Sequence, residues 1–260
     1  MAKRPDKVKK RDLRILWNSN SPHSNSGYAV YSRDLLFRLA KDGWSVACSG
    51  FSGIQTYPVF LHGGDLIDER FKDVILKVYP QLADPFGSDA MVDHAVDWKA
   101  NAAFSMQDVW TLQPDKLTQL KTWIPYVPID KSPTPKGVLD KLRYAYKIIT
   151  FSKFGHDQLE EDGFTSQLIH EGVDTEIFKP MDKQKMREKY GLPKDVFLFG
   201  MVAANKENPP RKGFQEVLDA FKLFVEKHPE AAIFFHSQQQ APGGFPVREY
   251  AHFLGVSKYC

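Results

Sequence analysis

Three cationic side chains stand in one short polar loop of the sequence. Lys206, Arg211 and Lys212 lie between an apolar, strand-like run and Gly213, which precedes an amphipathic helix. Cations just before a helix N-terminus add to its partial positive charge, so such a loop suits a diphosphate better than a neutral ligand. Gly213 lets the backbone approach a ligand closely. The alternative is a solvated basic loop. The sequence has no G-x-x-x-x-G-K-[ST] motif, which disfavours ATP hydrolysis of the P-loop kind.

A second polar loop, over residues 18–26, ends at Ser26 and is followed by Gly27. It follows an apolar run and precedes a helix, and its small residues leave backbone N–H groups accessible to a phosphate or a sugar hydroxyl. His23 lies in this loop and could hydrogen-bond a ligand. The alternative is an ordinary strand-to-helix connection, since the G-x-G-x-x-G dinucleotide fingerprint is absent.

Asp130 follows an extended, proline-containing segment. At that position it would face the same ligand-binding cleft as the two polar loops. Its carboxylate could orient an acceptor hydroxyl or take its proton, and the alternative is a surface residue in a turn. The eight histidines and two cysteines show no metal-ligand spacing, and no G-x-S-x-G nucleophile motif is present. We therefore expect no metal site.

Apolar runs alternate with amphipathic stretches from residue 13 onward. Residues 13–17 read as a strand, residues 27–41 as a helix and residues 44–51 as the next strand, which together have the length of a βαβ unit. The segment over residues 62–65 reads as a turn. Further strands are expected at residues 102–104, 123–128, 146–151 and 167–169. This alternation predicts an α/β fold with a Rossmann-like parallel sheet and helices on both faces.

The pattern starts again after Pro180. Residues 196–203 read as a strand, and the helix after Gly213 carries six apolar residues on one face. A chain of 260 residues has room for one large domain or two small ones. We expect a basic tail over residues 1–12, a Rossmann-like acceptor domain over residues 13–180 and part of a second Rossmann-like domain over residues 181–260.

Composition places the protein among ordinary globular chains, with 42% hydrophobic and 26% charged residues. Lys and Arg exceed Asp and Glu by 35 − 32 = 3, so no strong field favours nucleic acid as a partner. No apolar run approaches the ~20 residues of a membrane helix. Few thiols and the lack of a signal peptide favour a cytoplasmic protein. The basic tail is expected to be solvated, with peripheral contact to an anionic membrane surface as the alternative.

Five segments, in this order and spacing, resemble retaining glycosyltransferases of the GT-B fold, in particular the family 4 group. The most specific is His-Glu-Gly-Val-Asp at residues 170–174, followed by Phe178 and Pro180, which is similar to that family's linker signature. The other segments are residues 26–36, 148–155, 199–202 and 211–214.

The resemblance implies two facing Rossmann-like domains with a nucleotide-sugar between them, and transfer of a hexose with retention. The donor would be UDP- or GDP-linked, with no cofactor and no metal. Lys206 stands where the family usually has an arginine, and Asp130 falls in the region where many members place a histidine. The expected donor-diphosphate residues are Ser26, Gly27, Lys206, Arg211, Lys212 and Gly213, and the expected catalytic residues are Asp130 and His23.

Family members continue through further βα units that carry an E-x7-E element, whereas about 80 residues follow Pro180 here. Three explanations stay open: a fragment, a donor domain completed by a partner chain, or a natural short form with a changed task. The leading expectation is a glycosyltransferase acting on a glycan, lipid or protein acceptor. The alternative is a non-catalytic module that binds a glycan or a partner protein. A dehydrogenase would require the missing glycine fingerprint.

Overall fold

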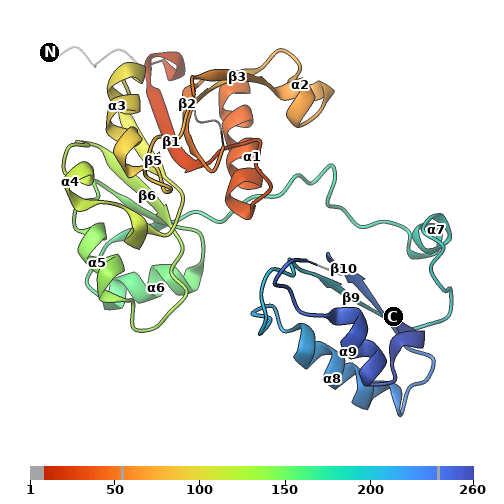
Figure 1. Ribbon diagram of the computed structural model, residues 1–260. Helices are drawn as coiled ribbons and strands as arrows, with labels where there is room; N and C mark the ends of the chain where they lie inside the picture. The colour runs from red at the N-terminus through yellow and green to blue at the C-terminus, as the bar shows by residue number, and fades with distance from the viewer. Residues whose placement is uncertain (1–8, 54–55, 239–240) are drawn as a thin grey trace, which may run out of the picture. The chain divides into compact units, whose positions relative to one another are not determined.

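The computed structural model describes residues 9–53, 56–238 and 241–260, and it divides into two compact units (Figure 1). Unit 1 comprises Met1–Asp174 and unit 2 comprises Thr175–Cys260. The first eight residues of the expected basic tail lie outside the described residues. The end of that tail forms a short 3-10 turn, η1 (Lys10–Asp12), in which the ammonium of Lys10 lies 2.6 Å from the carboxylate of Asp42.

Unit 1 is built on an eight-stranded sheet with the order β3-β4-β2-β1-β5-β6-β7-β8. The strand bounds are β1 (Arg14–Asn20), β2 (Ser45–Phe51), β3 (Val59–His62), β4 (Ile75–Tyr79), β5 (Ala102–Ser105), β6 (Trp123–Val127), β7 (Ile148–Thr150) and β8 (Ser166–Leu168). All described pairings are parallel except that of β3 with β4. Strands β2 to β4 lie on one side of β1, and the chain then crosses to the other side, where β5 to β8 follow in order. Such a reversal leaves a crevice beyond the carboxyl ends of the strands.

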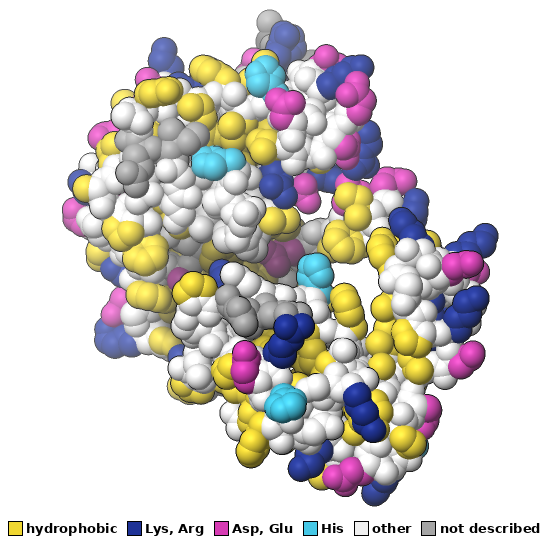
Figure 2. All heavy atoms as spheres, turned by 45° about the vertical axis from the view of Figure 1, so that its right-hand side comes forward, with side chains coloured by type: hydrophobic (Ala, Val, Ile, Leu, Met, Phe, Trp, Pro, Cys, Tyr) yellow, Lys and Arg dark blue, Asp and Glu magenta, His cyan; other side chains and the backbone are white. Residues whose placement is uncertain are grey.

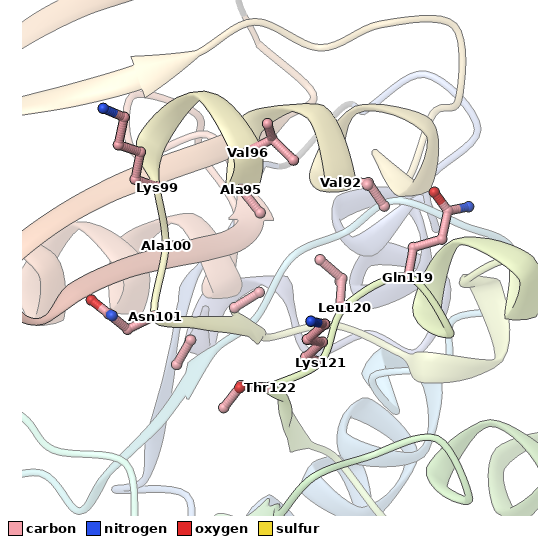
Figure 3. A pocket seen from close by; sticks show the side chains of 12 residues that line it. Val92, Ala95, Val96, Lys99, Ala100, Asn101, Gln119, Leu120, Lys121 and Thr122 are labelled. Carbon is pink, nitrogen blue, oxygen red and sulfur yellow. The ribbon is translucent and has the colours of Figure 1, made fainter.

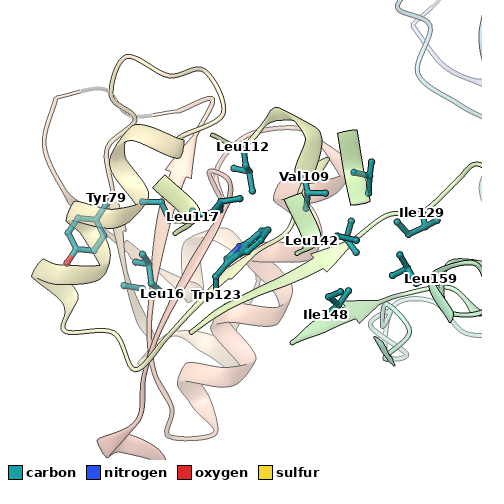
Figure 4. Close-up of a cluster of buried hydrophobic side chains, with 14 residues drawn as sticks. Leu16, Tyr79, Val109, Leu112, Leu117, Trp123, Ile129, Leu142, Ile148 and Leu159 are labelled. Atoms are coloured by element: carbon teal, nitrogen blue, oxygen red, sulfur yellow. The ribbon is translucent and has the colours of Figure 1, made fainter. Parts of the chain in front are cut away.

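Helices cover both faces of this sheet (Figure 1). On one face lie α1 (Gly27–Lys41) and α2 (Gly63–Leu66), and on the other lie α3 (Ser88–Trp98), α4 (Pro114–Leu117), α5 (Lys136–Leu142) and α6 (Lys153–Glu161). Successive side chains of a strand point to opposite faces. Leu16 of β1 therefore joins the buried cluster under α3 to α6, which centres on Trp123 (Figure 4), while Trp17 joins the cluster under α1. This architecture confirms the expected Rossmann-like α/β fold.

Local side chains and glycines set where several helices begin and end. The Ser26 hydroxyl accepts a hydrogen bond from the Ala29 N–H and caps α1, and Gly43, with a φ of 90°, ends that helix in the left-handed region. Ser152 caps α6 in the same way, and Asp182 caps the first helix of unit 2. Each of these helix ends is thus set by a residue within a few positions of it.

The first polar loop is shorter than expected, because β1 continues through Asn20. Asn18 and Ser19 are therefore strand residues, and both side chains are fully buried. The Ser19 hydroxyl donates to the Met106 carbonyl (2.9 Å), and the Asn18 amide donates to the Ser49 carbonyl (3.2 Å). These hydrogen bonds compensate for burial, which is why polar residues stand in a buried strand.

The segment over residues 62–65, expected as a turn, instead begins the short helix α2. Gly63 is buried there, and a Cβ on it would lie 2.7 Å from Phe71 and 2.9 Å from Phe37. The glycine therefore permits close packing against the core rather than a reversal of the chain.

Unit 2 is smaller and is organised around one long helix. Its elements are α7 (Lys183–Lys189), β9 (Leu198–Val202), α8 (Phe214–Val225), β10 (Ala232–His236) and α9 (Val247–Phe253). The two strands pair in parallel. Phe214, Leu218, Phe221 and Val225 lie on the buried face of α8, as the helical spacing predicted.

Candidate functional site

Three carboxylates and one tyrosine lie together at the carboxyl ends of the unit 1 strands. Asp108 follows β5, Asp130 follows β6, Glu171 follows β8, and Tyr28 stands in the first turn of α1. Burial, and then the negative charges of Asp108, Glu171 and Asp130, raise the pKa of Tyr28 to about 12. All three carboxylates therefore act on one phenol. We call Asp108, Asp130 and Glu171 the acidic edge.

The pKa values of two members of the acidic edge are raised. Desolvation, and then the neighbouring charge of Asp130, raise the pKa of Asp108. Desolvation also raises the pKa of Glu171. A carboxyl group with a raised pKa matches the operating range of a general acid or base better than an ordinary surface carboxylate does. The side chains of all three carboxylates are exposed.

The structure places the two expected catalytic residues differently. Asp130 belongs to the acidic edge and lies near Asp108, as its electrostatic effect on that residue shows. His23 is exposed on the loop before α1, where its Nδ1 lies 2.9 Å from the Ser21 hydroxyl. Within the described residues, no hydrogen bond or ion pair joins His23 to Asp130. Their catalytic roles stay predictions.

Ser26 and Gly27 stand at the start of α1. The Ser26 oxygen already accepts the capping hydrogen bond from Ala29, so its remaining contribution to a ligand is its O–H donor. Gly27 is exposed, and a Cβ placed on it would meet nothing within 4 Å. The backbone at this helix start is therefore open to a ligand, and the expected binding of a diphosphate there stays a prediction.

A buried polar network supports the acidic edge from beneath. The Gln107 amide donates to the Asn18 side-chain oxygen, and the Ser49 hydroxyl lies 2.9 Å from His94 Nδ1. The Asn18 amide also donates to the Ser49 backbone, which joins the two pairs. Burial lowers the pKa of His94 to about 4, so this imidazole is neutral at neutral pH. The network holds Gln107 in place and thereby fixes the start of the segment that carries Asp108.

Sequence reasoning missed Asp108, Glu171 and Tyr28 as site residues. Asp108 and Glu171 each follow a strand end by three residues, since β5 ends at Ser105 and β8 at Leu168. That position after parallel strands is the signal that could have identified them.

Unit 2 carries the three expected cations on the loop between β9 and α8. Lys206, Arg211 and Lys212 are all exposed, and we call them the basic loop. Arg211 Nε lies 3.1 Å from a Glu207 carboxylate oxygen. Gly213 has a φ of 73° and stands directly before α8, so its lack of a side chain permits the left-handed turn into the helix. Binding of a diphosphate to this loop stays a prediction.

Asn205 organises the loops at the carboxyl ends of β9 and β10. It is 2% exposed, and its amide donates to the carbonyls of Gln238 (3.1 Å) and Phe245 (2.8 Å), while its oxygen accepts from the Phe245 N–H (2.7 Å). A hollow beside it is lined by residues 202–204 and 235–238. The Ser237 hydroxyl in that lining is buried with no hydrogen-bond partner in the described part of the chain.

Two other hollows lie away from these groups. One is at the amino ends of β5 and β6, where its lining includes Val96, Asn101 and Leu120 (Figure 3). The other faces α1 and is lined mainly by apolar side chains, among them Trp17 and Ile149. Ligands of open α/β sheets bind at the carboxyl ends of the strands, so neither hollow is the candidate site.

Residues 9–53, 56–238 and 241–260 contain no group of three His, Cys, Asp or Glu side chains that could hold a metal ion. No helix among them is long and apolar enough to cross a membrane. On the face drawn in Figure 2, Lys and Arg are interspersed with Asp and Glu rather than gathered into one basic patch.

No family model and no curated protein sequence matches the chain, but solved structures do. A glycosyltransferase from Rickettsia africae ESF-5 superposes with a TM-score of 0.60 at 15% identity, covering 95% of this chain and 66% of that one. A UDP-GlcNAc 2-epimerase from Neisseria meningitidis, bound to UDP-GlcNAc, gives 0.57 at 9% identity, covering 93% and 70%. A co-structure of S. aureus MnaA with UDP gives 0.56 at 14% identity, covering 94% and 66%.

The chain thus spans about two thirds of the length of the structures it resembles. At these identities the likeness establishes the fold, which is of the GT-B type with Rossmann-like architecture.

Proposed function

We propose that the chain is a glycosyltransferase that moves a hexose from a UDP- or GDP-sugar to an acceptor hydroxyl, with retention of configuration. The observation that carries this proposal is the basic loop, which stands immediately before the N-terminus of α8 at the carboxyl end of a parallel strand. Breaking a glycosidic bond to a diphosphate needs charge stabilisation on the departing oxygens, and fixed cations at a helix N-terminus supply it.

Unit 2 supplies the donor-binding groups in this proposal. Lys212 lies closest to the helix start and neutralises the leaving diphosphate, while Lys206 adds a second positive charge. Arg211 pairs with Glu207 in an exposed contact, with side chains 72% and 50% exposed. Exposed pairs of this kind are worth only about 0–1 kcal/mol, so a diphosphate can replace Glu207 at small cost.

Unit 1 supplies the acceptor-binding groups. Asp130 orients the acceptor hydroxyl at the exposed rim, and Asp108 takes its proton, since burial and the charge of Asp130 raise the pKa of Asp108. In the transfer, the bond between the anomeric carbon and the diphosphate oxygen breaks and a bond to the acceptor oxygen forms. The acceptor proton passes to the carboxylate, and the diphosphate departs as an anion.

The finer parts of the proposal rest on the sequence. Membership of family 4, a reaction without a metal or cofactor, and an acceptor that is a glycan, a lipid or a protein follow from the family resemblance, which the match of residues 170–174 to the linker signature supports. The proposed cytoplasmic location is supported by the small number of thiols.

The test is incubation of the full chain with UDP-glucose, UDP-GlcNAc or GDP-mannose together with simple glycoside acceptors. Nucleotide release is followed by a coupled assay, and the new linkage by NMR. An α-linked product from an α-linked donor supports the proposal. Conversion of UDP-GlcNAc to UDP-N-acetylmannosamine would instead identify an epimerase.

Calorimetric titration with UDP and GDP separates the enzyme from a non-catalytic module. We expect sub-millimolar binding of at least one nucleotide. Affinities of millimolar or worse for both, together with tight glycan binding, would contradict the proposal and support the binding module.

A further inference from the structure

Two aromatic rings stand exposed at the carboxyl edge of the unit 1 sheet. Trp110 follows β5 and is 59% exposed, and Phe86 follows β4 and is 39% exposed. Their ring centroids lie 6.5 Å apart with an interplanar angle of 57°. The other four tryptophans of the chain are buried or half-buried. Trp110 and Phe86 together form what we call the aromatic platform.

Trp110 is held outward by its immediate neighbours. It lies in the 3-10 turn η3 (Val109–Thr111), between Val109 and Leu112, which are each 1% exposed and belong to the core of unit 1. Thr111 closes the turn by donating from its hydroxyl to the Asp108 carbonyl (2.7 Å). Because both flanking side chains are anchored in the core, the indole cannot retreat from solvent without unfolding the turn.

Phe86 is held by hydrogen bonds and by a buried ring. The Asp84 carboxylate accepts from the Phe86 N–H (2.8 Å) and from the Gln113 amide (2.9 Å), which ties the loop before α3 to the loop after η3. The Phe86 ring packs edge-on against the buried Phe51 ring, with centroids 6.4 Å apart. Both rings of the platform are thus preorganised, and ligand binding does not have to order them.

The chemistry beside the platform selects its occupant. Asp108 lies two residues before Trp110, and its carboxylate accepts hydrogen bonds. A purely apolar ligand that covered this carboxylate would remove its water without giving it a hydrogen-bond partner, which is unfavourable. An anionic ligand would be repelled by the acidic edge. A neutral sugar ring fits both features, because its C–H face stacks on an aromatic ring while its hydroxyl groups donate to carboxylates.

We propose that the aromatic platform binds a pyranose ring of the acceptor, with the C–H face of the sugar on Trp110 and Phe86 and its hydroxyl groups toward Asp108. That this sugar is the acceptor of a transfer rests on the proposed function. The binding itself needs no donor, so it can be measured separately.

The experiment uses the full chain and four probes: methyl α-D-glucopyranoside, methyl α-D-mannopyranoside, N-acetylglucosamine and lactose. Saturation-transfer NMR detects binding, and tryptophan fluorescence reports it independently. At least one probe is expected to bind in the millimolar range. Trp110→Ala lowers that affinity roughly tenfold, Phe86→Ala lowers it about threefold, and Trp110→Phe retains most of it because a ring remains.

Tyr146→Ala is the matched control, since Tyr146 is 65% exposed and hydrogen-bonds through its N–H to the Trp123 carbonyl at the amino ends of β6 and β7. This variant is expected to bind the probes as the wild type does. Thermal unfolding of each variant checks that the fold is intact.

The proposal is overturned if no probe binds, or if Trp110→Ala and Phe86→Ala bind as tightly as the wild type. Concentration-dependent sedimentation that disappears in Trp110→Ala would also overturn it, because a second copy would then cover the platform. Loss of sugar binding in Trp110→Ala without any nucleotide-sugar turnover would retain the platform and remove the proposed transferase. Nucleotide-sugar turnover together with equal sugar affinity in Trp110→Ala and the wild type would retain the proposed transferase and remove the platform.

Discussion

The acidic edge of unit 1 and the basic loop of unit 2 occupy equivalent places in their units and carry opposite charges. Each follows parallel strands at their carboxyl ends, in loops that lead into helices. The strands and helices are built from the same kinds of apolar pattern, so the charge difference comes from the loops alone. The scaffold thus determines where a ligand binds, and the loops determine which chemistry it meets.

The two regions also differ in their electrostatics. Asp108 and Glu171 are exposed at the surface, yet the partial desolvation of their carboxyl groups raises the pKa of each. The three cations of the basic loop are exposed. Carboxyl groups with a raised pKa suit proton transfer, whereas exposed cations attract an anionic ligand in a salt-dependent way. The proposed division is therefore proton chemistry in unit 1 and anion binding in unit 2, and the following variants test it.

Removing the charge next to α8 tests the basic loop most directly. Lys212→Ala is expected to lower kcat by about 10²–10³-fold, the usual effect of deleting one preorganised group that stabilises developing charge. Nucleotide release is the readout. Lys222→Ala, an exposed change within the same helix, is the control and should leave kcat within twofold. Equal kcat in the Lys212 and Lys222 variants would remove Lys212 from the mechanism.

The buried imidazole beneath the acidic edge makes the stability of unit 1 depend on pH. His94 has a folded-state pKa of about 4, below its ordinary value of 6.5, so the unfolded chain binds the proton more readily. Stability is therefore full above about pH 6.5 and falls as the pH drops toward 4, by at most about 3 kcal/mol.

All five tryptophans lie in unit 1, so their fluorescence during urea unfolding measures that unit alone. His94→Gln is expected to flatten the loss of stability between pH 7 and pH 4.5. The same loss in the wild type and in His94→Gln would show that another group carries the pH dependence.

Neutralising one carboxylate sharpens the role of the acidic edge. Asp130→Asn removes a negative charge that raises the pKa of Asp108, so that pKa falls and the acid limb of the rate profile moves to lower pH. We expect about a tenfold loss of kcat/KM as well, because the acceptor hydroxyl loses its orienting partner. Asp73→Asn, an exposed change elsewhere in unit 1, should alter neither. An unmoved acid limb in Asp130→Asn would contradict the coupling to Asp108.

Substitution of Asp174, the last residue of unit 1, is expected to have the smallest effect, which is on the stability of that unit. The Asp174 side chain is 6% exposed and accepts from Arg38 Nη2 (2.8 Å) and Arg70 Nη2 (2.6 Å). Asp174→Asn is expected to destabilise unit 1 by about 1 kcal/mol in urea unfolding, a modest value because the two arginines are about 40% exposed and water can solvate them. Asp157→Asn, which breaks an exposed pair with Lys153, should cost less than about 0.5 kcal/mol. An equal cost in both variants would show that burial of Asp174 adds nothing.

The features that sequence predicted are those set by local pattern. The apolar face of α8 depends on residues within a few positions of one another, and the structure confirms it. Asp130 could be placed at the edge because it follows a strand. The burial of Asn18 could not be predicted, because its partners Ser49 and Gln107 come from other strands and loops.

The convergence of Tyr28, Asp108 and Glu171 could not be predicted from the sequence either, since it depends on the spatial order of the strands. In the sheet, β1 lies between β2 and β5, and β8 forms an edge. Chain order alone does not contain that arrangement, so the members of the acidic edge other than Asp130 emerge only from the fold.

The two ends of helix α1 lie at two different features of unit 1. Its 15 residues form a stiff rod roughly 22 Å long, with the open backbone of Gly27 at one end and Arg38 near the other. Arg38 donates a hydrogen bond to Asp174, the residue at which the chain leaves unit 1. Helix α1 therefore connects, as one rigid element, the open backbone at Gly27 with the ion pair that holds the last residue of unit 1.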